Sequence, residues 1–132
     1  MAVKKRIEVA AAIIRHNGKI LITERPDGTH LEGLWEFPGG KKEKGESLDE
    51  CIKREIREEL GVQVNPLKLL VNVTHEYETK IVELYAFLCA LAHGIPVPLE
   101  GQRMQWVDPE ELSLFRFPPP DQQIIEVLYN GT

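Results

Sequence analysis

Residues 40–62 read GKKEKGESLDECIKREIREELGV, and the second half of this segment has the marks of a helix with defined ends. Ser47 is a favoured N-cap residue, acidic residues follow it in what would be the first turn, and Gly61 is a natural residue just past a helix C-terminus. The segment therefore predicts a helix from Leu48 to Leu60 that follows a glycine-containing loop.

On a helical wheel this helix has an apolar stripe formed by Leu48, Cys51, Ile52, Ile56 and Leu60. Glu55, Glu58 and Glu59 fall within an arc of about 100° that overlaps the apolar side. Three carboxylates about 5 Å apart repel by roughly 3 kcal/mol per pair at an effective dielectric near 20, so some are protonated or a cation lies among them. Such oxygen ligands suit Mg²⁺ or Mn²⁺. Taken alone, however, the run EIREE is typical of a solvated helix face.

The spacing around the run makes the pattern specific. After Gly40 come five residues, Glu46, seven residues, and then the sequence REIREELGV at positions 54–62. This arrangement matches the Nudix box, GX₅EX₇REUXEEXGU with U aliphatic, at every fixed position. The chain is thereby identified as a member of the Nudix hydrolases, and its resemblance to the MutT-type group extends from the segment around Ile7 to the last predicted helix.

The resemblance implies a role for each position of the box. The implied catalytic residues are Arg54, Glu55, Glu58, Glu59 and, outside the box, Glu100. The implied metal ligands are Gly39, Glu55, Glu58, Glu59 and Glu100. Glycines at 39 and 40 would let the backbone approach the metal and the substrate. Gly40, Glu46 and Gly61 would support the ligands, with Glu46 and Arg54 orienting the carboxylates.

Glu100 is assigned through a second stretch, Glu100-Gly101-Gln102 followed by Trp106. It resembles the MutT loop that carries an additional catalytic or metal-binding glutamate. The alternative is an ordinary loop glutamate beside a glycine. His75 is interpreted as structural, because the family places its general base on glutamate.

Four residues outside the acidic cluster are implied in substrate binding. In MutT-type enzymes the position of Phe37 packs near the base, that of Arg25 lies by the nucleotide, and that of Lys41 is near the phosphates. Asp121 stands where MutT has an asparagine that reads the base edge. An ionised aspartate only accepts hydrogen bonds, and related enzymes that prefer modified cytidine nucleotides carry aspartate here. A plain N-cap role for Asp121 is the competing interpretation.

The remaining pattern predicts an α/β chain. Ile7–Arg15 and Lys19–Arg25 flank His16-Asn17-Gly18 and should form a hairpin, whereas Leu31–Gly45 is irregular and predicts a loop. The other predicted elements are two antiparallel strands at Leu67–Thr74 and Ile81–Leu91, a short strand at Gln105–Val107, a helical turn at Pro109–Leu112 and an amphipathic helix after Asp121. With the resemblance, residues 1–132 are expected to form one Nudix domain, an α/β/α sandwich with a mixed sheet between helices.

Composition excludes several classes of partner. The net charge of −5 argues against binding of DNA or RNA polymers, because proteins that bind them usually have a strongly basic surface. Cys51 and Cys89 form no CxxC pair and are expected to be buried thiols. Charges at Glu8 and Arg15 interrupt the apolar N-terminal run, so no signal peptide or membrane span is expected. We therefore expect a cytoplasmic monomer or homodimer.

The resemblance implies hydrolysis of a nucleoside triphosphate to a nucleoside monophosphate and pyrophosphate, with Mg²⁺ as cofactor and Mn²⁺ as a substitute. The first expected substrate is 8-oxo-dGTP, in sanitation of the nucleotide pool and hence DNA repair. The alternative is (d)CTP or a 5-substituted CTP. Hydrolysis of ADP-ribose or another sugar nucleotide, and a non-catalytic Nudix binding module, are further alternatives.

Overall fold

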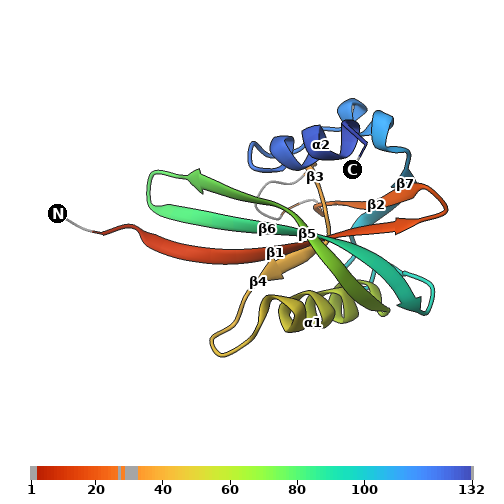
Figure 1. Cartoon of the computed structure of the whole chain (residues 1–132), viewed down its shortest axis with the longest axis horizontal. Coiled ribbons are helices and arrows are strands. Elements are labelled where there is room, and N and C mark those ends of the chain that lie inside the picture. The colour runs from red at the N-terminus through yellow and green to blue at the C-terminus, as the bar shows by residue number, and fades with distance from the viewer. Residues whose placement is uncertain (1–2, 27, 29–32, 132) are drawn as a thin grey trace.

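A mixed sheet runs through the computed structural model, which describes residues 3–26, 28 and 33–131 (Figure 1). Within the described residues its seven strands are β1 (Lys5–His16), β2 (Lys19–Glu24), β3 (Trp35–Glu36), β4 (Gly39–Lys41), β5 (Gln63–Glu76), β6 (Lys80–His93) and β7 (Arg103–Val107). The helices are α1 (Leu48–Leu60), the 3-10 helix η1 (Pro109–Leu114) and α2 (Asp121–Tyr129). The strand order is β3-β2-β1-β6-β5, with β4 paired to β1 and β7 to β2. Strands β1 and β6 run parallel.

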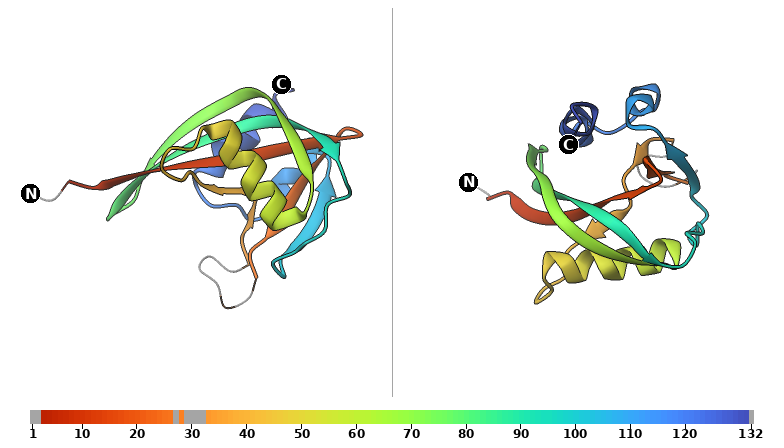
Figure 2. Two further views of the ribbon diagram at one scale, coloured as in Figure 1. Left: turned by 90° about the horizontal axis from the view of Figure 1, so that it is seen from below. Right: turned by 45° about the vertical axis from the view of Figure 1, so that its right-hand side comes forward.

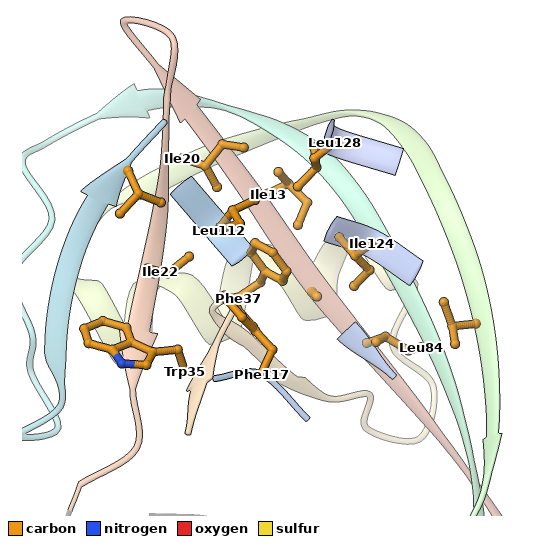
Figure 3. Packing of buried hydrophobic residues seen from close by; sticks show 14 residues of the cluster. Ile13, Ile20, Ile22, Trp35, Phe37, Leu84, Leu112, Phe117, Ile124 and Leu128 are labelled. Atoms are coloured by element: carbon orange, nitrogen blue, oxygen red, sulfur yellow. The ribbon is translucent and has the colours of Figure 1, made fainter. Parts of the chain in front are cut away.

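Helices cover both faces of this sheet, with α1 on one side and η1 and α2 on the other (Figure 2). Side chains of successive β1 residues point to opposite faces of the sheet, as the two-residue period of a strand requires, and they pack in two different hydrophobic clusters. Ala12 and Ile14 pack with α1. Ala11 and Ile13 belong to the cluster beneath α2, where Ile124 and Leu128 contribute from that helix (Figure 3). The predicted α/β/α sandwich with a mixed sheet is confirmed.

Helix α1 begins and ends where its local signals predict. The Ser47 side chain accepts from the Glu50 backbone N–H at 3.1 Å, and the Ser47 N–H donates to the Glu50 carboxylate at 2.8 Å. Gly61 takes the left-handed conformation with φ of 70°, which a residue without a Cβ adopts at little cost. These two ends fix the position of every acidic residue that α1 carries.

Both predicted antiparallel pairs are present. Asn17 and Gly18 have φ of 53° and 77°, as a tight hairpin turn between β1 and β2 requires. The β5–β6 pair is also antiparallel, but β5 begins at Gln63 rather than Leu67. Pro66 is tolerated there because β5 is an edge strand, and its pairing with β6 shifts register on either side of Pro66.

The prediction of an irregular segment over residues 31–45 is wrong in part, and its residues 31 and 32 lie outside the described residues. β3 and β4 are short strands, and β4 pairs Gly39 with Ala11 and Gly40 with Ala10. Glycine permits this pairing, since a Cβ on Gly39 would lie 2.1 Å from the Ala10 carbonyl oxygen. The two glycines therefore allow β4 to pair with β1, so this segment is part of the sheet and not a free loop.

The N-cap prediction for Asp121 is wrong. Pro120 occupies the cap and Asp121 is the first residue of α2. The Asp121 N–H already donates to the Pro118 carbonyl at 3.0 Å, so the proline-rich turn starts the helix one residue early. The Asp121 side chain is thus released from capping and is 8% exposed.

Both cysteines, Cys51 and Cys89, are buried free thiols, as predicted. Burial is the main cause that raises the pKa of Cys51 to about 11 and that of Cys89 to about 12. Among the residues described, no helix is both long enough and apolar enough to cross a membrane.

Candidate active site

Four carboxylates from three separate elements line one cavity of about 290 Å³. Glu36 comes from β3, Glu55 and Glu59 from α1, and Glu100 from the loop between β6 and β7. Gly39 lines the same cavity. Arg25 lines it as well, so the structure brings together five of the predicted site residues and adds Glu36.

Glu59 is the most enclosed of these acids, with 9% of its surface exposed. Its Oε2 accepts a hydrogen bond from the Gly39 N–H at 3.1 Å. Burial, followed by the negative charges of Glu55, Glu36 and Glu100, raises the pKa of Glu59 to about 9. Positive charge inside the cavity would relieve this repulsion.

Arg54 donates hydrogen bonds to two carboxylates, those of Glu46 and Glu55. Its Nε donates to Glu46 at 2.6 Å and its NH2 donates to the other Glu46 oxygen at 3.0 Å, a two-point contact. NH1 donates to Glu55 at 2.8 Å, and NH2 also donates to the Lys41 carbonyl at 3.1 Å. Hydrogen bonding from Arg54 lowers the pKa of Glu46 to about 2. Arg54 thus ties the loop before α1 to a carboxylate of the cavity.

Glu58 lies differently from its two neighbours. The prediction that it overlaps the apolar side is wrong, because its side chain is 55% exposed and forms an ion pair with Arg54 at 3.5 Å. It sits at the solvent end of the predicted arc and does not line the cavity. Its charge still contributes to the raised pKa of Glu55, after burial as the largest cause.

Gly40 provides space for Glu55. A Cβ at position 40 would lie 2.4 Å from the Glu55 carboxyl carbon and 2.6 Å from both of its oxygens. The carboxylate therefore rests against bare backbone, and any side chain at this position would displace it. The predicted supporting role of Gly40 has this steric basis.

Gly40→Ala is expected to lower kcat about 10- to 100-fold, the range typical of lost support behind a metal ligand. The end of Glu55 is flexible, so it should move while the fold persists. Gly45→Ala is the matched control, since a Cβ there meets nothing within 4 Å and its φ of 81° costs stability only. Steady-state kinetics with thermal unfolding of both variants checks this, and an unchanged kcat in Gly40→Ala would contradict it.

Gln102 was missed in the sequence, although it stands in the quoted Glu100-Gly101-Gln102 stretch. Its Nε2 donates to the Glu59 carbonyl at 3.1 Å, and its Oε1 accepts from the Glu100 N–H at 2.8 Å. Gln102 is 8% exposed. The Leu99 N–H also donates to the Glu59 carbonyl, at 3.0 Å. These bonds hold the loop that carries Glu100 against the end of α1, which favours a site role for Glu100 over an ordinary loop glutamate.

Glu36, which directly precedes Phe37, was also not predicted as a site residue. Its carboxylate accepts from Arg25 NH1 at 3.1 and 3.3 Å. Burial raises the pKa of Glu36 and the Arg25 charge opposes that rise. Arg25 therefore lies at the wall of the acidic cavity, next to the place expected for a nucleotide.

A second cavity, of about 250 Å³, contains the other predicted substrate residues Phe37, Lys41 and Asp121. Arg25, Glu36 and Gly39 line both cavities, so the two are joined. No hydrogen bond from another described residue reaches the Asp121 carboxyl. Burial, and then the charge of Glu36, raises the pKa of Asp121 to about 7.

A family model described as a NUDIX domain matches residues 9–127. The chain belongs to the Nudix hydrolases. This Nudix chain is 38% identical over 130 residues to an 8-oxo-dGTP diphosphatase of Haemophilus influenzae, covering 98% of this chain and 96% of that one. It is also 38% identical to a CTP pyrophosphohydrolase of Escherichia coli, covering 92% of this chain and 90% of that protein.

Solved structures of Nudix relatives have the same fold. The E. coli ORF135 protein superposes with a TM-score of 0.84 at 35% identity, covering 96% of this chain and 91% of that one. A MutT protein of Methanosarcina mazei gives a TM-score of 0.84 at 27% identity over the whole of both chains. The likeness therefore extends across the helices and the sheet that position the carboxylates.

Nudix hydrolases generally need a divalent metal ion, and the donor chemistry of the acidic cavity fits one. Its carboxylates are hard oxygen ligands, and burial followed by their mutual repulsion raises the pKa of Glu59. Within the described residues, no three acidic, His or Cys side chains already stand in a metal-ligand grouping. Glu55, Glu59 and Glu100 face the cavity, whereas the Glu58 side chain is directed to Arg54.

Proposed function

We propose that this Nudix hydrolase cleaves nucleoside triphosphates to a nucleoside monophosphate and pyrophosphate in the presence of Mg²⁺. The observation that carries the proposal is the junction of two cavities. One is lined by Glu36, Glu55, Glu59 and Glu100, and the other contains the carboxyl of Asp121, a residue that is 8% exposed. A triphosphate fits the first with a cation present, and a nucleoside fits the second.

Mg²⁺ bound by Glu55, Glu59 and Glu100 would offset the charge of the triphosphate and increase the electrophilicity of phosphorus. Arg54 keeps Glu55 in orientation through its bond to Glu46. Water attacks the β-phosphorus, and a glutamate of the cavity accepts its proton. The bond from the β-phosphorus to the oxygen that bridges it to the α-phosphorus breaks. The water oxygen leaves in pyrophosphate and the bridging oxygen stays on the monophosphate.

As the first substrate we propose 8-oxo-dGTP, which would give the enzyme a cytoplasmic role in nucleotide-pool sanitation and DNA repair. This rests on the extent of similarity to enzymes named 8-oxo-dGTP diphosphatase. The second candidate is a cytidine triphosphate. Asp121 favours it, since a carboxylate accepts from the amino group of cytosine, and a relative of equal identity is named CTP pyrophosphohydrolase.

A substrate panel tests the proposal. Pyrophosphate release is measured with Mg²⁺ from 8-oxo-dGTP, dGTP, dCTP, 5-methyl-dCTP and ADP-ribose, and kcat/KM is compared. The largest value for 8-oxo-dGTP supports pool sanitation, and the largest for cytidine nucleotides supports Asp121 as the determinant of base choice. Cleavage of ADP-ribose alone, without pyrophosphate, or no turnover of any compound, would overturn the proposal.

The buried Asp121 carboxyl also predicts a pH dependence of stability. Its ordinary pKa is 3.8, and in the folded chain the pKa is about 7, so the folded state holds the proton more tightly. The stabilisation is complete below about pH 4 and is lost as pH rises through about 7. Between pH 4 and 8 the free energy of unfolding of the wild type should fall by about 1 to 4 kcal/mol more than that of Asp121→Asn.

Urea unfolding of the metal-free and nucleotide-free proteins at several pH values checks this. Comparison with Asp121→Asn cancels the contribution of Glu59, whose pKa is also raised. Parallel pH profiles for the wild type and the variant would contradict the effect of burial on the Asp121 carboxyl.

A further inference from the structure

The aromatic surface offered to a base in the second cavity is not the one expected from the sequence. Phe37 is 5% exposed, and its ring is stacked on Phe117 with centroids 5.1 Å apart and an angle of 25° between the planes (Figure 3). Phe37 therefore belongs to the hydrophobic core and forms part of the cavity wall. Little of its face is left for a nucleobase.

Tyr77 is the other aromatic residue that lines this cavity among the described residues, and it is half-buried. It lies in the turn between β5 and β6, which is far from Phe37 in the sequence. Tyr77 also lines an adjoining groove together with Arg25 and Lys80. Its ring thus lies where the cavity and this groove adjoin, a position from which it can pack on a bound base.

The turn holds Tyr77 in place through several contacts. The Tyr77 N–H donates to the Lys80 carbonyl at 2.7 Å, and the Tyr77 carbonyl accepts from Lys4 Nζ at 3.0 Å. The Lys80 Nζ lies 5.5 Å from the ring centroid, and the His75 ring meets the Tyr77 ring edge-on with centroids 4.6 Å apart. A ring fixed in advance loses little conformational entropy when it packs on a ligand.

Tyr77 and Asp121 are far apart in the sequence and line the same cavity. They are near enough that the Asp121 charge, after burial, contributes to the raised pKa of the Tyr77 phenol. One offers an aromatic ring and the other a hydrogen-bond acceptor. This is the pair of groups that recognition of a planar base with a polar edge requires.

We propose that Tyr77 is a substrate-binding residue that packs its ring on the nucleobase whose edge Asp121 contacts. The inference rests on the proposed function, since it names a residue that binds the substrate at the same site. Packing of a base on an aromatic ring is sequence-tolerant in itself, so Tyr77 supplies affinity for a base while Asp121 supplies discrimination.

The test compares Tyr77→Ala and Tyr77→Phe with the wild type on dCTP, 8-oxo-dGTP and base-free 1′,2′-dideoxyribose 5′-triphosphate. Tyr77→Ala should raise KM for both nucleotides about 10- to 100-fold with kcat nearly unchanged, whereas Tyr77→Phe retains most of the affinity. Kinetics on the base-free compound should be the same in all three proteins. Tyr129→Ala is the matched control, because Tyr129 is 67% exposed and lines neither cavity.

Binding of dCMP and of deoxyribose 5-phosphate, measured by calorimetry, separates this inference from the proposed function. A protein that turns over no triphosphate but loses dCMP affinity in Tyr77→Ala would refute the proposed reaction and support the base contact. An unchanged KM and dCMP affinity in Tyr77→Ala would overturn the inference. So would an equal loss on the base-free compounds, since Tyr77 would then act on the fold or on the phosphates.

Discussion

Glu59→Gln should lower kcat by about 10³- to 10⁵-fold and at the same time make the metal-free protein more stable at neutral pH. The amide removes a metal ligand or proton acceptor from the cavity. It also removes the cost of protonating Glu59 on folding. Burial and three neighbouring acids raise the pKa of Glu59 to about 9, so at neutral pH the folded chain holds a proton that the unfolded chain does not. A residue whose loss improves stability and abolishes activity is one retained for function.

Turnover with Mg²⁺ and thermal unfolding in EDTA check this pair of effects, with Glu110→Gln as an exposed control on η1. The family resemblance assigns the same catalytic loss to Glu58→Gln. Because Glu58 is exposed and paired with Arg54, its substitution should bring no comparable gain in stability. Unchanged turnover in both Glu59→Gln and Glu58→Gln would refute the assignment of the site.

Arg54→Ala is the second substitution with a large expected effect. Loss of the guanidinium removes the Arg54 donor from Glu55 and leaves Glu46 with the Glu43 N–H as a donor. It also detaches the loop before α1 from the cavity. We expect kcat to fall by about 100-fold or more, with a higher Mg²⁺ concentration needed for half-maximal activity. Arg54→Lys should recover little, because an ammonium cannot make the two-point contact with Glu46.

Kinetics over a Mg²⁺ titration measures both quantities, with Arg57→Ala as the control on the exposed face of the same helix. If Arg54→Ala loses stability but keeps its kcat and its Mg²⁺ requirement, Arg54 is a structural residue only. If Arg54→Lys restores full activity, the two-point geometry is not what the site uses.

The helix and its acids could be predicted because their causes are local. The Ser47 cap, the Gly61 terminus and the spacing of Glu55 and Glu59 are all encoded within residues 47–61. The same is true of the β1–β2 hairpin, whose turn needs only Asn17 and Gly18. Backbone geometry of this kind follows from neighbouring residues and is readable without the rest of the chain.

The parts that were missed depend on contacts between distant segments. Gln102 matters because its side chain bonds to both the Glu59 carbonyl and the Glu100 N–H. The bond to Glu59 joins residues that are 43 positions apart. Tyr77 enters the site through the turn between β5 and β6. Glu58 forms an ion pair with Arg54, and a helical wheel does not show such a pairing. Tertiary contacts of this type leave no periodic signal in the sequence.

The central claim is that the cavity of Glu55, Glu59 and Glu100 hydrolyses a nucleoside triphosphate between its α- and β-phosphates in the presence of Mg²⁺. ³¹P NMR of dCTP and 8-oxo-dGTP hydrolysis in H₂¹⁸O, with Mg²⁺ and then with EDTA, tests it most directly. We predict equal amounts of monophosphate and pyrophosphate, with ¹⁸O in the pyrophosphate, and loss of both in EDTA and in Glu59→Gln. Release of inorganic phosphate and a diphosphate, ¹⁸O in the monophosphate, or turnover that survives EDTA would contradict the claim.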